Sequence, residues 1–369
     1  MVNSTPNPIR EYYIAYFDIL GYKDFFQATP EKATDFLSLI HNAIQRTNNH
    51  IRFANESIIA SAYGKINIHV KIFSDNFLLC METLEETVEP VRVLAFLKIV
   101  SDIQRGFVTE FDLFVRGGIT RGDLSYNDDY VFGEGLIEAV SMEDTIAKYP
   151  RIIVNQKVVD GLFQNRFYSQ EEFERAASIE TRIKNNESVL EEEKKFHSEI
   201  LFKMQVLQIH LTYANALLFQ WPDGFCVLNY LHQVHSIDML SQEKQNAFLQ
   251  VIKQAAPDLF NHILQSTLYL DNAMFEQSDA TDEKVLSKHK KIVTEHLLQF
   301  GNNQDIVTGD FKAAEQREHK LRKYIWAMAY HNYVCDMYQK PEYKILTKCN
   351  CDTRFLKMTI EVLEDEARI

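Results

Sequence analysis

The strongest constraint on the fold is a stretch in which apolar and polar residues alternate and the chain then turns back. Every second residue from Ile66 to Ile72 is apolar, which is the period of a strand with one buried face. Ser74-Asp75-Asn76 follows as a turn, and the apolar run from Phe77 to Cys80 returns as the partner strand. The sequence therefore predicts a hairpin, and with it a sheet that contains antiparallel pairs.

The segments around this hairpin alternate between strand and helix patterns. Short apolar runs bounded by turn residues predict strands, and apolar residues at helical spacing predict helices. The expected elements are strands at 12–17, 113–120 and 151–154, and helices at 31–47, at 93–107 and from Gly133 onward. Strands alternating with helices around a central hairpin predict an α/β sandwich with a mixed sheet and flanking helices.

The second half of the chain has a different pattern. Residues 169–210 are charged and helical, and Trp221-Pro222-Asp223-Gly224 predicts a late hairpin of the same sheet. Beyond about Asn229 the pattern is nearly all helix, with apolar faces at 248–255, 285–297 and 321–329. We therefore expect a sheet-containing domain over 1–230, with a helical insertion at about 169–210, and a helical C-terminal region over 231–369.

Charge and hydropathy exclude several kinds of partner. The formal net charge is −13, from 52 acidic and 39 basic residues, whereas proteins that grip nucleic acid through its phosphates are usually basic. The N-terminus has no apolar segment typical of a signal peptide. No apolar run approaches the ~20 residues of a membrane span. We therefore expect a cytoplasmic protein whose main partner is neither nucleic acid nor a membrane.

Two aspartates and one arginine are the candidate catalytic residues. Asp18 follows an apolar strand and Asp75 lies in the hairpin turn, so two carboxylates near adjacent strand ends could hold two divalent ions about 3.5–4 Å apart. The carbonyl of Ile19 would add a hard oxygen ligand. Arg116, at an expected strand end, could hold phosphates bidentately, and Lys71 shares a strand face with Asp75 and could reach a base. Taken alone, an aspartate at a strand end is usually a cap or turn residue, and Arg116 or Lys71 could be a solvated surface residue.

Together these segments resemble class III nucleotidyl cyclases. FDILGY resembles the family's FxDIxGF, KIFSD its KxxGD with Ser74 in place of glycine, and VRGGITRG its RxGIxxG. VFGEGLIEAVSMEDTIAKYPRIIV resembles the segment around WGxxVNxAxRLE. The resemblance covers about residues 12–154. It implies that two metal ions cyclise a nucleoside triphosphate and release pyrophosphate, at an active site formed between the two subunits of a homodimer.

The departures from the family pattern are specific. Ile137 stands at the family's transition-state asparagine and Ser141 at its transition-state arginine, so Arg121 or Lys148 would have to supply the missing charge. Tyr130 stands where adenylyl cyclases have a base-reading aspartate. The hairpin with Ser-Asp, GEGLIEA and YPRIIV look more like bacterial Pycsar cyclases. Those enzymes make cyclic CMP or cyclic UMP in antiphage defence and prefer manganese.

The resemblance thus implies a pyrimidine nucleotide cyclase that uses UTP or CTP with Mn²⁺ or Mg²⁺. Its product would act through a cyclic-nucleotide-responsive effector of the membrane or TIR type. An adenylyl cyclase is an alternative that Lys71 favours and Tyr130 disfavours. A catalytically inactive nucleotide-sensing or dimerisation module is another. Replacement of the transition-state pair favours the inactive module, and retention of Asp18 and Asp75 disfavours it.

Overall fold

The structure is a computed structural model, and the part described here comprises the following residues: 8–23, 67–84, 89–127, 129–164, 167–232, 282–301, 311–352 and 357–362, with Thr34, Ser38 and His41. The helix predicted at 31–47, apart from those three residues, and the apolar face predicted at 248–255 lie outside the described residues.

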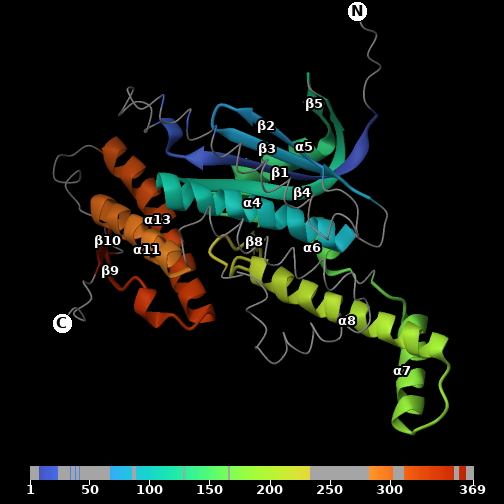
Figure 1. Ribbon diagram of the computed structural model, residues 1–369. Helices are drawn as coiled ribbons and strands as arrows, with labels where there is room; N and C mark the ends of the chain where they lie inside the picture. Colours follow the sequence, from blue (N-terminus) through green and yellow to red (C-terminus); the bar gives the residue numbers. More distant parts are fainter. Residues whose placement is uncertain are drawn as a thin grey trace, which may run out of the picture.

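A mixed sheet forms the centre of the molecule (Figure 1), as the sequence predicted. Its strand order is β2-β3-β1-β4-β6-β8-β7, with β5 paired to β4. The pairs are antiparallel except for β4 with β6. The strands are β1 (Arg10–Leu20), β2 (Ile68–Phe73), β3 (Asn76–Glu82), β4 (Phe114–Tyr126), β5 (Val131–Phe132), β6 (Ile152–Val154), β7 (Leu218–Gln220) and β8 (Cys226–Leu228). The last two form the late hairpin that the Trp221 turn predicted.

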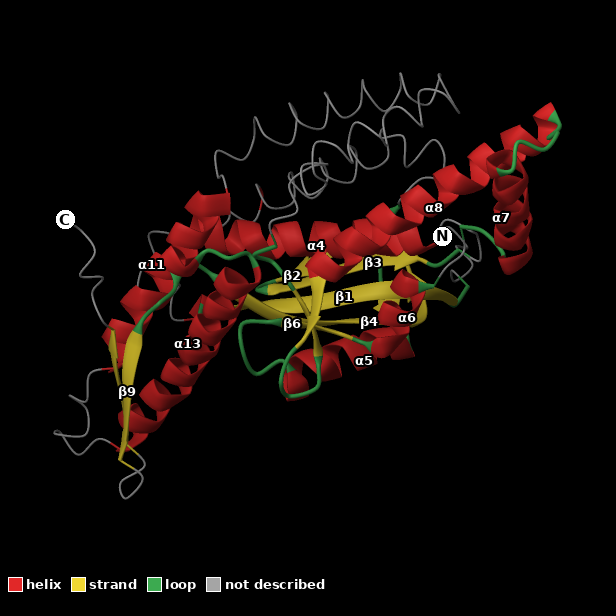
Figure 2. Ribbon diagram, turned by 90° about the horizontal axis from the view of Figure 1, so that it is seen from below, coloured by secondary structure: helices red, strands yellow, loops and turns green. Residues whose placement is uncertain are grey.

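Helices cover the two faces of the sheet unequally. The helices α4 (Glu89–Phe111), α6 (Gln156–Phe163) and α8 (Glu191–Leu217) pack on one face, while α5 (Glu134–Ser141) and the π-helix η2 (Met142–Ile146) lie on the other (Figure 2). The helix α7 (Gln170–Lys184) pairs with α8. Central strands buried on both faces read as continuous apolar runs, which is why the sequence of β1 does not alternate.

Two boundaries differ from the prediction. The strand β1 continues past Asp18 to Leu20, and β4 runs through Arg116 and two glycines to Tyr126. Arg116 therefore lies inside a strand and not at the expected strand end. A Cβ on Gly117 would lie 2.4 Å from that of Phe17, and one on Gly118 2.5 Å from that of Met142. The glycines let β1 and η2 approach β4 closely.

Two long helices, α11 (Asp282–Gly301) and α13 (Phe311–Met337), pack together and bury the apolar faces predicted at 285–297 and 321–329. The expected helical C-terminal region also contains a strand pair that was not predicted from the sequence: β9 (Thr347–Asp352) and β10 (Lys357–Val362) pair antiparallel after the short helix η4 (Pro341–Tyr343). Both strands alternate polar and apolar residues, which is a strand period. None of the described helices is long and apolar enough to span a membrane.

A buried polar network, here called the histidine core, connects α11 and α13 to the segment after β8. It consists of Asn229, Tyr230, His289, Tyr330 and His331, all of which are at most 1% exposed. The His331 Nε2–H donates to the carbonyl of Tyr343 at 2.8 Å, so the Nδ1 of His331 must accept from the Nδ1–H of His289 at 3.1 Å. The Nε2 of His289 then accepts from the Tyr230 hydroxyl at 2.8 Å. The three hydrogen bonds therefore all point the same way, from the Tyr230 hydroxyl through the neutral rings of His289 and His331 to the carbonyl of Tyr343.

Candidate functional site

Asp18 and Arg116 face each other across the central strand pair. The register places Asp18 of β1 opposite Arg116 of β4, so the two side chains leave the same face of the sheet. The Arg116 Nε donates to Asp18 Oδ1 at 3.0 Å and its Nη2 to Oδ2 at 3.3 Å. This two-point contact is the geometry in which a guanidinium binds a carboxylate most specifically. The structure therefore brings together two of the predicted catalytic residues.

A third charged residue, Glu143 of η2, joins this pair and was not predicted. Its Oε1 lies 2.7 Å from Arg116 Nη2, although the angle is not that of a hydrogen bond. Asp18, Arg116 and Glu143 are called the carboxylate cluster below. The sequence signal was present, because Glu143 aligns with the final glutamate of the family's WGxxVNxAxRLE segment.

Burial raises the pKa of both acids in the carboxylate cluster. Burial raises the pKa of Asp18 above its usual value, and the opposing effect of Arg116 does not cancel this. Burial, with the nearby charge of Asp18, raises the pKa of Glu143 to about 7. Burial therefore disfavours the charged form of both carboxylates more than Arg116 favours it, and such perturbed groups are typical of candidate functional sites.

Asp75 lies in the β2–β3 turn, which is fixed to the end of β1. The Ile19 N–H donates to the carbonyl of Asp75 at 3.1 Å, and Asn76 Nδ2 donates to Asp75 Oδ1 at 3.3 Å. The Tyr16 hydroxyl donates to the side-chain oxygen of Asn76 at 2.8 Å. Because Asn76 pairs with Asp18 across β1 and β3, the turn holds Asp75 next to the carboxylate cluster.

These residues fit divalent ions in their chemistry. Asp18 and Asp75 are the hard oxygen donors that Mn²⁺ and Mg²⁺ prefer, and Asp18 already binds a cation, the guanidinium of Arg116. Within the described residues, no group of three or more His, Cys, Asp or Glu is arranged to hold a metal. A ligand set made of Asp18, Asp75 and the carbonyl of Ile19 therefore stays a prediction.

The predicted base-reading residues lie near the β4–β5 hairpin. Lys71 Nζ is 5.2 Å from the ring centroid of Tyr126, and His69 stacks on the same ring at 4.3 Å. Tyr130 lies in the connection to β5, where its N–H donates to Asn127 Oδ1 at 2.7 Å. No described contact joins Lys71 to Tyr130, so Tyr126 is the aromatic residue beside Lys71 that the sequence did not single out.

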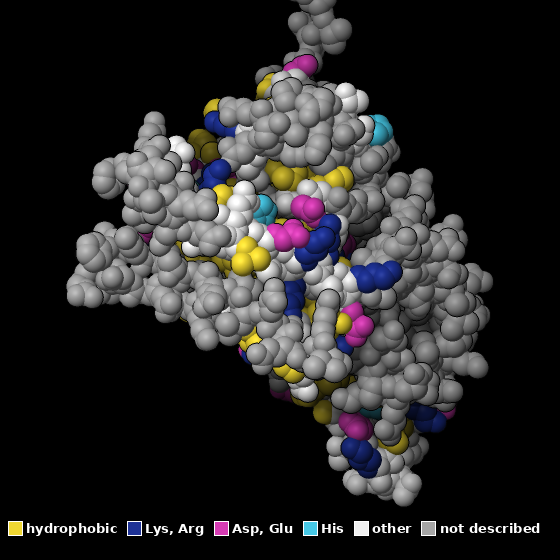
Figure 3. All heavy atoms as spheres, turned by 90° about the vertical axis from the view of Figure 1, so that its left-hand side faces the viewer, with side chains coloured by type: hydrophobic (Ala, Val, Ile, Leu, Met, Phe, Trp, Pro, Cys, Tyr) yellow, Lys and Arg dark blue, Asp and Glu magenta, His cyan; other side chains and the backbone are white. Residues whose placement is uncertain are grey.

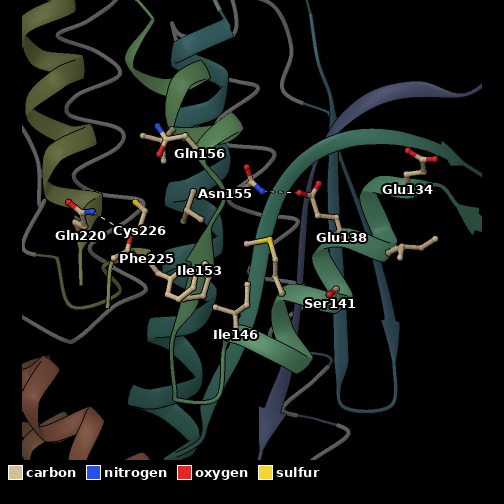
Figure 4. Close-up of a pocket in the computed structure, with 15 residues that line it drawn as sticks. Glu134, Glu138, Ser141, Ile146, Ile153, Asn155, Gln156, Gln220, Phe225 and Cys226 are labelled. Atoms are coloured by element: carbon tan, nitrogen blue, oxygen red, sulfur yellow. Dashed lines mark hydrogen bonds between the residues drawn. The ribbon is translucent and has the colours of Figure 1, made fainter. Parts of the chain in front are cut away.

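The positions of the family's transition-state pair line a groove and not the carboxylate cluster. Ile137 and Ser141 of α5 border a hollow of about 1010 Å³, opposite Gln220, Phe225 and Cys226 near the β7–β8 hairpin. Figure 4 shows Ser141 and Glu138 on α5 facing this hollow. Ile137 is 66% exposed. Both side chains are uncharged, and both are exposed to solvent on the face of the sheet that α5 covers.

Of the two cations expected to replace the missing charge, Arg121 is engaged elsewhere. Its Nη2 lies 2.5 Å from Glu11 Oε2, near the opposite end of β1. A cation of the C-terminal region acts on the cluster through space, since the charge of Lys323 on α13 acts to lower the pKa of Asp18, against the rise that burial causes. Figure 3 views this end of the molecule, where acidic, basic and histidine side chains lie next to one another. No motif marked Lys323 in the sequence.

Comparisons with known proteins give structural similarity only. No family model matches the chain, and no curated protein sequence matches it. The structure is similar to the guanylyl cyclase domain of the RhoGC fusion protein from Blastocladiella emersonii, with 15% identity and a TM-score of 0.32 over 43% of this chain and 88% of that one. It is also similar to the adenylyl cyclase CyaB from P. aeruginosa, with 12% identity and a TM-score of 0.32 over 43% and 83%.

A third similar structure is a class III adenylyl cyclase-like ATP-binding protein from Pseudomonas aeruginosa. It has 13% identity and a TM-score of 0.26, over 44% of this chain and 37% of that one. Identities and TM-scores this low do not establish a family or an activity. Conclusions about function therefore depend on the side chains of this chain.

Proposed function

We propose that this chain is a class III-like nucleotidyl cyclase that converts UTP or CTP to the 3′,5′-cyclic nucleotide and pyrophosphate. The observation that supports this most is the position of Asp18, Asp75 and Arg116. A strand, a hairpin turn and a neighbouring strand bring two carboxylates and one guanidinium to the same end of the sheet. This set provides for both a triphosphate and its counterions, and it agrees with the motif resemblance over residues 12–154.

Each of the three side chains has a defined task in this proposal. Asp18 and Asp75 would hold two divalent ions, Mn²⁺ or Mg²⁺, which lower the pKa of the attacking hydroxyl and neutralise the phosphates. Arg116 has a planar fork of donors, and its task is to hold the phosphates that leave as pyrophosphate. Positioning and electrostatics dominate phosphoryl transfer, so these groups suffice without a covalent intermediate.

The pyrimidine preference depends on the residues near the β4–β5 hairpin. A tyrosine at position 130 is bulkier than aspartate and can donate to or accept from a base edge. Lys71, beside the ring of Tyr126, would contribute a cation to the same region. A site that hydrogen-bonds one base edge rejects bases that leave its polar groups unpaired.

The test is incubation with each of four radiolabelled nucleoside triphosphates and Mn²⁺, followed by separation of the products. Cyclic UMP or cyclic CMP as the main product supports the proposal, and Tyr130→Asp should erode the preference. Cyclic AMP as the main product would refute the pyrimidine preference and leave the cyclase function standing. No cyclic product from any nucleotide would refute the cyclase function itself.

A homodimer with sites shared between subunits is part of this proposal. Because Asp18 and Arg116 pair within one chain, each site of a mixed dimer of Asp18→Ala and Arg116→Ala chains should lack one of these residues, and mixing should restore no activity; restored activity would mean that Arg116 acts across the interface. A fully active monomer by light scattering would refute the dimer. The product would act through a separate cyclic-nucleotide-responsive effector in antiphage defence. The test of this role is phage challenge of cells that carry either the wild-type protein or the Asp18→Ala variant.

A nucleotide-binding module without turnover is a second candidate, and the exposed Ile137 and Ser141 favour it. Neither side chain can stabilise developing negative charge as an asparagine and an arginine can. Nucleotide binding without any cyclic product at long incubation would support this candidate.

A further inference from the structure

Arg116 is shared between two carboxylates from different elements. It contacts Asp18 of β1 at two points, 3.0 Å and 3.3 Å, and Glu143 of η2 at 2.7 Å. The side chain of Glu143 is only 9% exposed, and that of Arg116 is 23% exposed. The guanidinium therefore bridges a predicted ion ligand and a second carboxylate that has no assigned role.

The two partners of Arg116 differ in what a divalent ion would do to them. A cation bound to Asp18 takes over that carboxylate and repels the guanidinium. If Asp18 were its sole partner, Arg116 would either exclude the ion or leave the site for solvent. Glu143 supplies a second partner from η2, so Arg116 can release Asp18 and remain beside it.

The backbone conformation around Glu143 fixes the position of this carboxylate. Glu143 lies in the π-helix Met142–Ile146. Single turns of π-helix are rare in proteins, and those that occur are often found at functional sites. The preceding residue, Met142, is buried directly against Gly118, where no Cβ would fit. This contact fixes η2 on β4, two residues from Arg116.

We propose that Glu143 is a positioning residue that holds Arg116 beside Asp18 while Asp18 binds a divalent ion. The proposal rests on the metal-dependent function proposed above. It makes Glu143 a competitor for the guanidinium and not a third ligand of the ion. Loss of Glu143 would leave Arg116 paired with Asp18 alone, so the guanidinium would compete more strongly with the ion.

The test is a double-mutant cycle on Mn²⁺ binding, measured without nucleotide by electron paramagnetic resonance of free Mn²⁺. The proteins are the full chain, Glu143→Gln, Arg116→Ala and the double variant. Glu143→Gln should weaken Mn²⁺ binding about ten-fold, which corresponds to ~1.4 kcal/mol. In the Arg116→Ala background the same change should have no effect, because the guanidinium that Glu143 holds is absent.

A matched control separates contact from net charge. Asp144→Asn removes the adjacent, exposed carboxylate, which acts on Arg116 through space, and it should change Mn²⁺ binding much less than Glu143→Gln. An equal effect of both variants would overturn the proposal, as would Mn²⁺ binding by Glu143→Gln at the wild-type level. An equal loss in both Arg116 backgrounds would instead make Glu143 an ion ligand and also overturn it.

Two further outcomes keep the inference separate from the proposed function. If Glu143→Gln fails to fold, Glu143→Asp takes its place, because the shorter side chain keeps the charge and loses the reach; wild-type Mn²⁺ binding by that variant would overturn the proposal. A chain that shows the expected cycle but cyclises no nucleotide would retain the positioning role and refute the enzyme. A wild-type chain that binds no Mn²⁺ would refute both.

Discussion

The molecule contains two largely buried polar clusters, and they are built in opposite ways. In the histidine core both imidazole rings have partners at both nitrogens, and Tyr330 donates to Asn229 at 2.7 Å. In the carboxylate cluster two acids share one guanidinium, and burial raises the pKa of both. The first cluster is neutral and satisfied, whereas the second holds two acids whose charged forms are disfavoured by burial.

This difference separates stability from function. A buried network in which every member is paired fixes one packing arrangement, and leaving one member unpaired is costly. A cluster with unbalanced charge gains from binding a cation and is the expected form of a ligand site. We therefore expect changes in the histidine core to affect unfolding, and changes in the carboxylate cluster to affect ion and nucleotide chemistry.

Asp18→Asn should give the largest effect on function and a small effect on stability. Loss of one ion-binding charge should lower the rate of cyclic nucleotide formation at least about 100-fold, or ~2.7 kcal/mol in activation free energy. The free energy of unfolding should change by less than about 1 kcal/mol, because the amide relieves repulsion with Glu143 while Arg116 keeps Glu143 as its partner. Product chromatography and urea unfolding measure the two quantities. An Asp18→Asn variant with wild-type activity would contradict the role of Asp18 in function. A variant that is inactive only because it unfolds would contradict the separation of function from stability.

The two clusters should respond to pH with opposite signs. Burial lowers the pKa of His331 to about 4, against an ordinary 6.5, so the folded state binds fewer protons between these values. The stability from His331 is then complete above pH 6.5 and is lost as the pH falls toward 4, by about 3 kcal/mol. Glu143, with a pKa of about 7 against 4.5, contributes most below pH 4.5 and loses that contribution as the pH rises through 7.

Urea unfolding between pH 4 and 7.5, with EDTA present, separates these contributions. His331→Phe should flatten the loss of stability in acid, and Glu143→Gln should reduce the loss toward neutral pH. The direction of donation in the histidine core explains the first effect, because an added proton places two N–H groups face to face. An unchanged acid slope in His331→Phe would contradict the assigned direction.

Asn229→Ala should lower the free energy of unfolding by about 2 kcal/mol, because it leaves the Tyr330 hydroxyl and the carbonyl of Ala216 without their buried partner. Mn²⁺ binding should stay at the wild-type value. The matched control is Asn185→Ala, an exposed asparagine, with an expected change within about 0.5 kcal/mol. A loss of Mn²⁺ binding in Asn229→Ala would show that the two clusters are coupled.

The local sequence pattern predicted the helices and strands, whereas the make-up of the candidate site depends on contacts between elements that are distant in the sequence. The apolar runs and the Ser74 turn correctly gave the hairpin and the mixed sheet, because strand period and turn chemistry are local. The motif alignment includes Glu143, but the contact of Glu143 with Arg116 depends on how η2 lies on β4, which the spacing of residues does not predict. The strand end predicted at Arg116 was wrong, because glycines that allow close approach between strands leave the same local signal as glycines that end a strand.

Lys323→Ala tests whether the C-terminal helices reach the carboxylate cluster. The ring of Tyr324 packs edge-on against Phe114, at 5.9 Å between centroids, which places α13 at the start of β4. Loss of the Lys323 charge should raise the KM for nucleotide about five-fold, or ~1 kcal/mol, with little change in kcat. Arg322→Ala is the control, because that exposed guanidinium pairs with Glu318 on its own helix. Equal effects of the two variants would mean general loss of positive charge.

Ser74→Gly should give the smallest effect and shows where the site region stores strain. Ser74 has a φ of 62°, a left-handed conformation that costs a residue with a Cβ about 1–2 kcal/mol and glycine almost nothing. Glycine also gains more freedom in the unfolded chain, so the expected net gain in stability is about 0.5 kcal/mol. Asn186, at a φ of 58° in the α7–α8 connection, is the control, because asparagine tolerates this conformation. Asn186→Gly should therefore gain less. If Ser74→Gly instead loses stability and weakens Mn²⁺ binding together, the serine holds the turn that presents Asp75, and strain at this position is part of the site.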